Sequence, residues 1–244
     1  MRRITLSGLA IALSLVAAAP LSAQGAPDGW RFTVEPYLMG ASITGKVGVA
    51  NQETSVDASF SDIISKLQFG AMGIVAARKG NWGVGADLIW TALGVNTPVP
   101  PASIDMNSGL FSFYGLRRLS PAAELTFGFR WNLMQNNIRF LGTNGVSLNS
   151  TRQWIDPLVG LNLRTPDNGS RWHAGLYSDI GGFGVGSKVT WQIFPTVGAQ
   201  LTKRMSLDLG YRWLHTNYET GKDLTFYKYD ATMQGPTMGF VFKF

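Results

Sequence analysis

The segment Met238-Gly239-Phe240-Val241-Phe242-Lys243-Phe244 ends the chain and decides how the rest of the sequence is interpreted. Side chains of a β-strand point alternately to its two faces, so the four even-numbered residues of this segment share one face. Those residues are one methionine and three phenylalanines. An apolar face of this size at a chain end is typical of a strand whose outer side meets lipid. The segment therefore predicts the last strand of a membrane-spanning sheet.

The start of the chain predicts export. Arg2 and Arg3 precede an apolar run over 6–19, and the small residue Ala23 closes the segment. This is the pattern of a secretory signal peptide, with cleavage expected after Ala23. The apolar run is shorter than the roughly 20 residues that a membrane-spanning helix needs, and no later segment approaches that length. Together the two chain ends predict an outer-membrane β-barrel of a Gram-negative bacterium. The expected parts are a signal peptide over 1–23 and one barrel domain over 24–244.

Composition narrows the function classes. The chain has 21 Lys and Arg against 15 Asp and Glu; loss of Arg2 and Arg3 leaves 19 basic residues and a net charge of +4. These charges are scattered over turns and form no stripe with interleaved aromatics, so we expect no nucleic-acid partner. The absence of cysteine excludes disulfides, a lipoprotein anchor and thiolate metal ligands.

Alternating polarity through the middle of the chain predicts the other strands. The odd positions over 189–201 are all apolar, as in a strand with one lipid face and one lumen face. We expect an all-β, antiparallel, up-and-down transmembrane barrel of about ten strands, with eight or twelve as alternatives. The segments 44–50 and 53–59 are assigned to a hairpin outside the membrane, because they are too short to span it. The expected strands are 30–41, 67–78, 82–93, 106–118, 123–138, 152–164, 171–182, 188–201, 205–217 and 229–244. The longer connections, at 42–66, 94–105, 139–151 and 218–228, are expected outside the cell.

The positions of the tryptophans support this strand layout, whereas the positions of four prolines argue against it. Tryptophans near both ends of the strands predict two aromatic girdles at the membrane interfaces. Those at the periplasmic ends are Trp30, Trp82 and Trp172, and those toward the outer ends are Trp90, Trp154, Trp191 and Trp213. Four prolines fall inside expected strands of a closed barrel, where each removes a hydrogen-bond donor; either bulges absorb them or some strand boundaries are wrong. They are Pro36, Pro157, Pro195 and Pro236.

Several short segments along the chain form a recognisable pattern. They are Trp30, Pro36-Tyr37-Leu38, Gly45, Phe60-Ser61-Asp62, the run from Asp179 to Ser187, and Gly210-Tyr211-Arg212-Trp213. Their pattern resembles that of uncharacterised proteobacterial outer-membrane proteins placed near the small OmpA-like and OmpW-like barrels. The resemblance covers nearly the whole mature chain and implies the barrel fold. It implies no agreed activity and supplies no motif residues for one.

Seven charged residues share the lumen-facing phase of the expected strands. Because a lone charge in a narrow barrel is costly to bury, we expect ion pairs and water to fill the interior around them. A cation-lined pathway or small-ligand site is the sharper alternative, and a catalytic carboxylate group is another. The residues are Glu35, Asp87, Arg130, Asp156, Asp179, Asp208 and Arg212.

Other candidate features favour structural roles. A hydrolase site could use His215 as a base with Ser187 or Asp223, but His215 shares the lipid-facing phase of its strand. The other histidine, His173, lies at the periplasmic end of its strand. The glycines over 182–186 lack nucleotide-loop spacing and predict a tight loop. Residues 60–67 predict a short amphipathic helix capped by Ser61. Eight cations on the periplasmic turns suit either anionic lipid headgroups or solubility. They are Arg78, Lys79, Arg117, Arg118, Arg164, Arg171, Lys203 and Arg204.

The leading hypothesis is an integral outer-membrane barrel that is structural or weakly conducting, with no catalysis, cofactor or metal. The expected partners are outer-membrane lipids and the barrel-assembly machinery. Three alternatives stay open: a narrow channel for small solutes or cations, an outer-membrane lipid hydrolase, and an adhesin-like binder that uses 42–66.

The terminal aromatic residues generate a first prediction. Phe240, Phe242 and Phe244 form the outward face of the closing strand, which resembles the signal read by the insertion machinery of such barrels. Deletion of Phe244 should sharply lower the amount of barrel in the outer membrane, while export across the inner membrane continues. Fractionation and immunoblotting measure both quantities. Unchanged outer-membrane levels of the truncated chain would contradict this assignment.

Overall fold

The computed structural model describes residues 29–49, 52–98, 101–140, 147–166 and 169–244, so the expected signal peptide lies outside the described residues. Strands make up most of this part of the chain, as the alternating sequence predicts. The elements are β1 (Arg31–Met39), β2 (Ser42–Val49), β3 (Gln52–Ala58), α2 (Phe60–Lys66), β4 (Leu67–Lys79), β5 (Trp82–Pro98), β6 (Pro101–Ser120), β7 (Ala123–Phe140), β8 (Ser147–Arg164), β9 (Trp172–Gly181), β10 (Val189–Thr202), β11 (Met205–Thr220), the 3-10 turn η1 (Asp223–Thr225) and β12 (Tyr227–Lys243).

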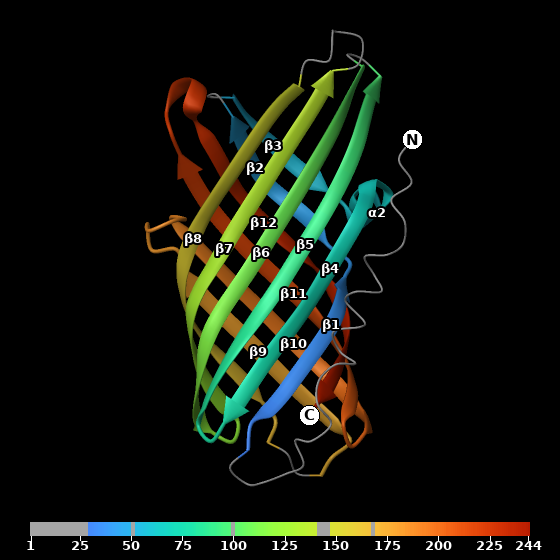
Figure 1. Cartoon of the computed structure of the whole chain (residues 1–244), viewed down its shortest axis with the longest axis vertical. Helices are drawn as coiled ribbons and strands as arrows, with labels where there is room; N and C mark the ends of the chain where they lie inside the picture. The colour runs from blue at the N-terminus through green and yellow to red at the C-terminus, as the bar shows by residue number, and fades with distance from the viewer. Residues whose placement is uncertain (1–28, 50–51, 99–100, 141–146, 167–168) are drawn as a thin grey trace.

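The sheet closes on itself. The barrel strands follow the order β1, β4 and then β5 through β12, and β12 also pairs with β1. The closing ladder is antiparallel and runs from Thr33 opposite Lys243 to Met39 opposite Thr237. Ten strands therefore form a closed barrel, which appears in Figure 1 as an upright cylinder of tilted strands. The predicted all-β barrel of about ten strands is confirmed.

The two ends of the barrel differ. One end is called here the short-turn end. It carries the β4–β5, β6–β7, β8–β9 and β10–β11 connections, the start of β1 and the end of β12 (Figure 1). At the opposite long-loop end, the described residues of the expected loops, 94–98, 101–105, 139–140 and 147–151, are strand. β5 continues to Pro98 and pairs Val95 with Ile104 of β6. The loop prediction was wrong there, because the arms of a hairpin satisfy each other's backbone groups and can extend into water.

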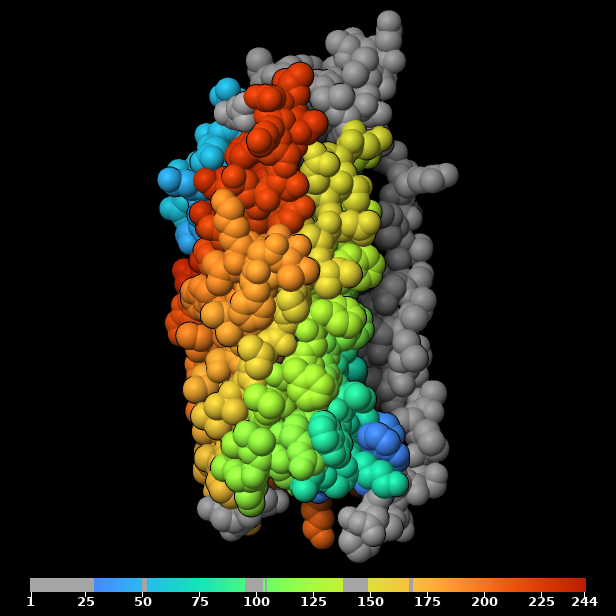
Figure 2. Space-filling model, turned by 90° about the vertical axis from the view of Figure 1, so that its left-hand side faces the viewer, coloured from blue at the N-terminus to red at the C-terminus, as the bar shows by residue number. Residues whose placement is uncertain are grey.

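β2 and β3 form the hairpin expected over 44–50 and 53–59. β2 lies along β12, with Ser42 opposite Gln234 and Val49 opposite Tyr227. Figure 2 shows the hairpin, coloured blue to cyan, beside the orange-red strands that come late in the chain. β3 pairs only with β2 within the described ranges. The hairpin is therefore an addition to a ten-stranded barrel, and the twelve-strand alternative is wrong.

Prolines mark interruptions of the hydrogen-bond ladder. Pro236 lies where β12 changes partner from β1 to β2, and its carbonyl accepts the Gly40 N–H at 2.8 Å. Pro36 is the last residue of β1 that pairs with β4, opposite Gly73. The β10–β11 pairing skips Pro195, and the β8–β9 pairing begins just after Pro157. Each proline thus stands where a donor is not needed, and the strands containing them keep their expected places.

The short helix α2 connects the hairpin to β4. Its N-cap is Ser59 and not the expected Ser61, because Ser59 and Asp62 satisfy each other reciprocally. The Asp62 carboxylate accepts the Ser59 N–H at 3.0 Å, and Ser59 Oγ accepts the Asp62 N–H at 3.3 Å. The bonds from Ser59 lower the pKa of Asp62 below its usual value. No described helix is long and apolar enough to cross a bilayer.

An apolar cluster fills part of the barrel interior, although most neighbouring lumen positions are polar. Ile89 and Leu110 meet Leu214 across the lumen, and Met39 and Met233 complete the packing. All five side chains are buried. The cluster also includes Tyr37 and Ala41, and it gives the barrel a packed core in place of an open bore.

This packing generates a second prediction. Replacing Ile89 with Ala should destabilise the barrel by about 2–5 kcal/mol, because the vacated volume lies among protein side chains. The neighbouring Leu88 faces outward, and lipid can fill the space left by Leu88→Ala. Urea unfolding in lipid vesicles should therefore show a clearly larger loss for Ile89→Ala. Equal losses would argue against a packed interior.

Candidate functional site in the barrel lumen

The structure places all seven sequence-selected charges on the inner face of the barrel wall. Arg130, Asp156 and Arg212 are fully buried, and Asp87 and Asp179 are nearly so. Glu35 and Asp208 lie toward the short-turn end and line a cavity there. Period-2 alternation in six different strands brings these side chains into one lumen.

The Arg212 guanidinium sits in a three-residue cluster at the centre of the lumen. It donates from Nη2 to Asp87 Oδ2 at 2.6 Å and from Nη1 to the Tyr37 hydroxyl at 2.7 Å. Tyr37 in turn donates to Asp87 Oδ1 at 3.0 Å. The guanidinium also lies 4.4 Å from the centre of the Phe194 ring. Charge pairing and the aromatic face offset much of the cost of its burial, and its Nε has no hydrogen-bond partner among the described residues.

Arg130 forms a second buried pair. Its Nη2 donates to Asp179 Oδ2 at 2.8 Å, and its Nε donates to Ser112 Oγ at 3.0 Å. A third bond runs from Nη1 to Thr190 Oγ1 at 3.0 Å. The pair therefore links β6, β7, β9 and β10 across the lumen, and every guanidinium nitrogen of Arg130 has a partner.

Asp156 is buried without an arginine partner in the described chain. Asp156 Oδ2 accepts bonds from Asn132 Nδ2 at 3.0 Å, Trp154 Nε1 at 3.1 Å and Ser187 Oγ at 2.8 Å. Trp154, expected in the outer girdle, instead faces the lumen and stacks on Tyr218 with ring centres 4.0 Å apart. Its girdle assignment was wrong, because it shares the inward phase of Asp156 and its indole N–H serves that carboxylate.

The loop 182–188 carries Ser187 into this network. Gly182 and Gly184 both adopt positive φ, which makes the turn tight, as the sequence predicts. His215 lies on the opposite side of the wall, where its Nδ1 is 3.1 Å from Thr232 Oγ1 and its ring stacks on Trp191. Ser187 and His215 therefore do not meet. Asp223 lies in η1.

Three arginines surround one carboxylate near the short-turn end. Arg78 binds Glu124 through Nε and Nη2 at 3.1 Å, and Arg164 and Arg118 approach it at 3.3 and 3.8 Å. Glu124 is almost fully buried. Sequence reasoning placed these cations on turns facing headgroups and missed their convergence. The signal was present, since Arg78 continues the inward phase of Ile74.

A cavity of about 650 Å³ opens at this end and is called here the vestibule. His173 Nε2 lies 3.0 Å from both carboxylate oxygens of Asp208 in its wall. A side chain at Gly198 would collide with this pair, so the glycine makes room for it. The vestibule shares Glu35 and Asp208 with a smaller pocket of about 160 Å³, which reaches Asp87 and Arg212. The central cluster closes the inner end of that pocket.

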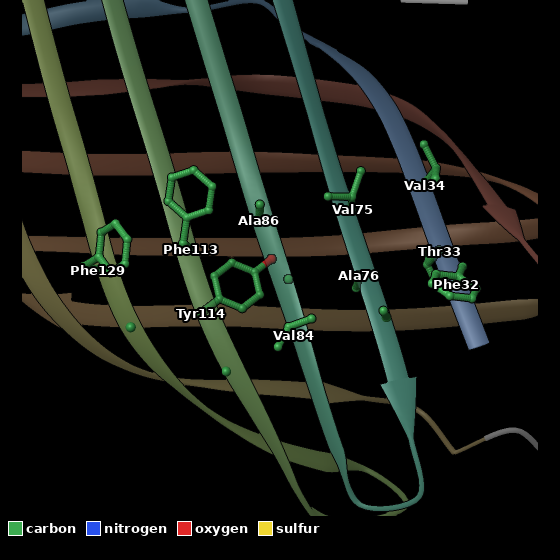
Figure 3. Close-up of a pocket in the computed structure, with 14 residues that line it drawn as sticks. Phe32, Thr33, Val34, Val75, Ala76, Val84, Ala86, Phe113, Tyr114 and Phe129 are labelled. Carbon is green, nitrogen blue, oxygen red and sulfur yellow. The ribbon is translucent and has the colours of Figure 1, made fainter. Parts of the chain in front are cut away.

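A second hollow, of about 600 Å³, lies on the outer wall. The residues that line it belong to the neighbouring strands β1 and β4 to β7, and Figure 3 shows their side chains. Phe32, Val75, Val84, Phe113 and Phe129 are all exposed and share the outward phase. The hollow is therefore part of the apolar belt expected to face lipid, and it is separate from the lumen. Among the described residues, no group of three His, Asp or Glu could hold a metal ion.

Comparison with solved structures places the fold among outer-membrane proteins. The outer-membrane protease OmpT from Escherichia coli superposes with a TM-score of 0.58 at 9% identity, covering 88% of this chain and 97% of that chain. Ail from Yersinia pestis gives 0.40 at 11% identity, covering 89% and 99%. The toluene transporter TbuX from Ralstonia pickettii gives 0.40 at 9% identity, covering 88% and 89%. The fold is that of an integral outer-membrane β-barrel. No family model matches the chain, and no curated protein does.

The central cluster generates a third prediction. Arg212→Met leaves the buried Asp87 carboxylate without its cation, which should cost about 3–5 kcal/mol of stability at neutral pH. Acid conditions that neutralise carboxylates remove the uncompensated charge, so the loss should shrink as the pH falls. Unfolding in detergent at both pH values measures it. Arg117→Met is the matched control, because Arg117 lies on the outer wall over Trp82. A small, pH-independent loss for Arg212→Met would contradict a buried pair.

Proposed function

We propose that the protein is a closed, non-catalytic barrel of the outer membrane that adds structure to the membrane without conducting solutes. The observation that supports this most directly is the burial of Arg130 and Arg212, each held by a carboxylate inside the lumen. A conducting pore needs a continuous hydrated path, and fully buried guanidinium groups leave no water around them at this level.

The lumen is obstructed more than once. The Arg212 cluster joins β11 to β5 and β1, and the Arg130 pair joins β7 to β9. The apolar cluster around Ile89 and Leu214 adjoins the Arg212 cluster through Tyr37. Toward the long-loop end, Trp154 and Tyr218 stack across the interior. Removing any single obstruction would leave the others in place. This arrangement supports a plugged barrel over the channel alternative.

The orientation follows from the connections. Bacterial barrels carry short turns on the periplasmic side and longer loops outside, so the short-turn end and the vestibule should face the periplasm. The β2–β3 hairpin and α2 then lie on the extracellular side. Lipid contacts fall on the apolar belt, and the aromatic stack of Trp90, Phe111 and Trp131 lies within it.

The fourth prediction tests closure. The refolded protein, shown to be folded by a heat-dependent shift on semi-native gels, should give no discrete conductance steps in planar bilayers. Liposomes containing it should not swell faster than empty liposomes in an isotonic small-sugar solution. Reproducible single-channel steps from the folded form would overturn the proposal and favour the narrow channel.

A further inference from the structure

We propose that the vestibule binds a phosphate-bearing anion from the periplasmic side, held by Arg118 and Arg164. The proposal concerns a different part of the lumen from the central plug and does not depend on whether the barrel conducts. It begins from an imbalance of charge around Glu124.

Glu124 can neutralise only one of the three guanidinium groups that surround it. Arg78 takes the bidentate position, with three hydrogen bonds between its guanidinium and the carboxylate. Arg164 makes one longer bond to Glu124, and Arg118 approaches only to 3.8 Å. Arg31 lies close enough to add its positive charge at Arg164. Glu124 therefore leaves two of the three surrounding guanidinium charges unbalanced, and Arg31 adds a further positive charge nearby.

The least satisfied of these cations faces the cavity. Arg118 lines the vestibule, its side chain is 25% exposed, and within the described part of the chain its one ion-pair contact is the 3.8 Å approach to Glu124. The accessible part of its guanidinium group is therefore available to an anion in the cavity. Arg164 and Asn162 line the same cavity, and the Asn162 side-chain amide donates to Glu124 at 3.4 Å. An anion at this point would supply additional acceptors.

The walls of the vestibule place the anion near its mouth. Arg31 and Lys243 also line the cavity and add positive charge, whereas Glu35 and Asp208 occupy its deeper part. A negatively charged group would be attracted to the arginines and repelled from the carboxylates beyond them. The cavity of about 650 Å³ has room for a phosphate together with a small attached group. The geometry points to binding at the entrance and not to passage through the barrel.

Guanidinium chemistry selects the ligand class. The planar fork of arginine matches the oxygens of a phosphate in a bidentate geometry, and two adjacent arginines can engage different oxygens of one phosphate. The phosphate could belong to a free periplasmic ion or to the headgroup of a lipid in the inner leaflet. Both sources present the same oxygens to Arg118 and Arg164.

The fifth prediction tests the site with inorganic phosphate. Calorimetric titration of the refolded protein in zwitterionic detergent should show saturable binding that weakens by roughly tenfold in Arg118→Gln, as expected for a lost charge-assisted contact. Arg118→Gln leaves Glu124 paired with Arg78 and Arg164, so the barrel should still fold. Arg117→Gln, one residue away but on the outer wall, is the matched control and should bind as the parent does.

A second arm identifies the source of the phosphate. The same variants are placed in nanodiscs with and without phosphatidylglycerol, and the melting temperature is measured. If a lipid headgroup occupies the site, the anionic lipid should stabilise the parent and Arg117→Gln but not Arg118→Gln. If a free ion is the ligand, only added phosphate should do so. Equal responses of Arg118→Gln and Arg117→Gln in both arms, or no response from the parent in either arm, would overturn the proposal.

Discussion

Pairing of β1 with β12 is the constraint on which the rest of the structure depends. Hydrocarbon offers no hydrogen-bond partners, so an open sheet would leave the edges of both strands unsatisfied in the membrane. Closure removes these edges. It also fixes ten strands around one lumen, which is narrow enough for Arg212 on β11 to reach Asp87 on β5 and Tyr37 on β1. The interior chemistry therefore follows from closure.

The lumen charges are arranged by how completely they are paired. At the centre, Arg130 and Arg212 each have a carboxylate, and the low polarity around them makes those pairs obligatory. At the short-turn end, water reaches the walls, and an excess of arginine over carboxylate is tolerated. The share of arginines that are paired with a carboxylate thus decreases from the centre of the lumen to the vestibule. The same sequence alternation produces both the paired central charges and the excess of arginine at the short-turn end.

Alternation made the barrel and its inward charges predictable, because the two-residue period assigns each side chain to a face wherever the strand is regular. It could not reveal which inward residues meet, since Asp87 and Arg212 are far apart in the chain and their contact depends on strand order and stagger. The assignment of Trp154 to the outer aromatic girdle was wrong. It was based on the position of Trp154 along the strand and did not consider that its side chain alternates to the inner face. Arg78 and Arg118 lie next to short turns, where side chains are usually exposed to solvent. The sequence therefore did not indicate that both side chains point into the lumen.

The change of partner at Pro236 has a consequence for how evenly the barrel resists local opening. Above Gly73, β4 has β5 as its ladder partner in the described chain, while the β2–β3 hairpin is tied to the barrel wall through β12. The wall thus consists of a continuous ring near the short-turn end and a part near the long-loop end whose circumference is interrupted. Local unfolding free energies differ between regions of one protein. Fluctuations of the barrel should therefore begin at the long-loop rim beside α2 and leave the ring at the short-turn end intact.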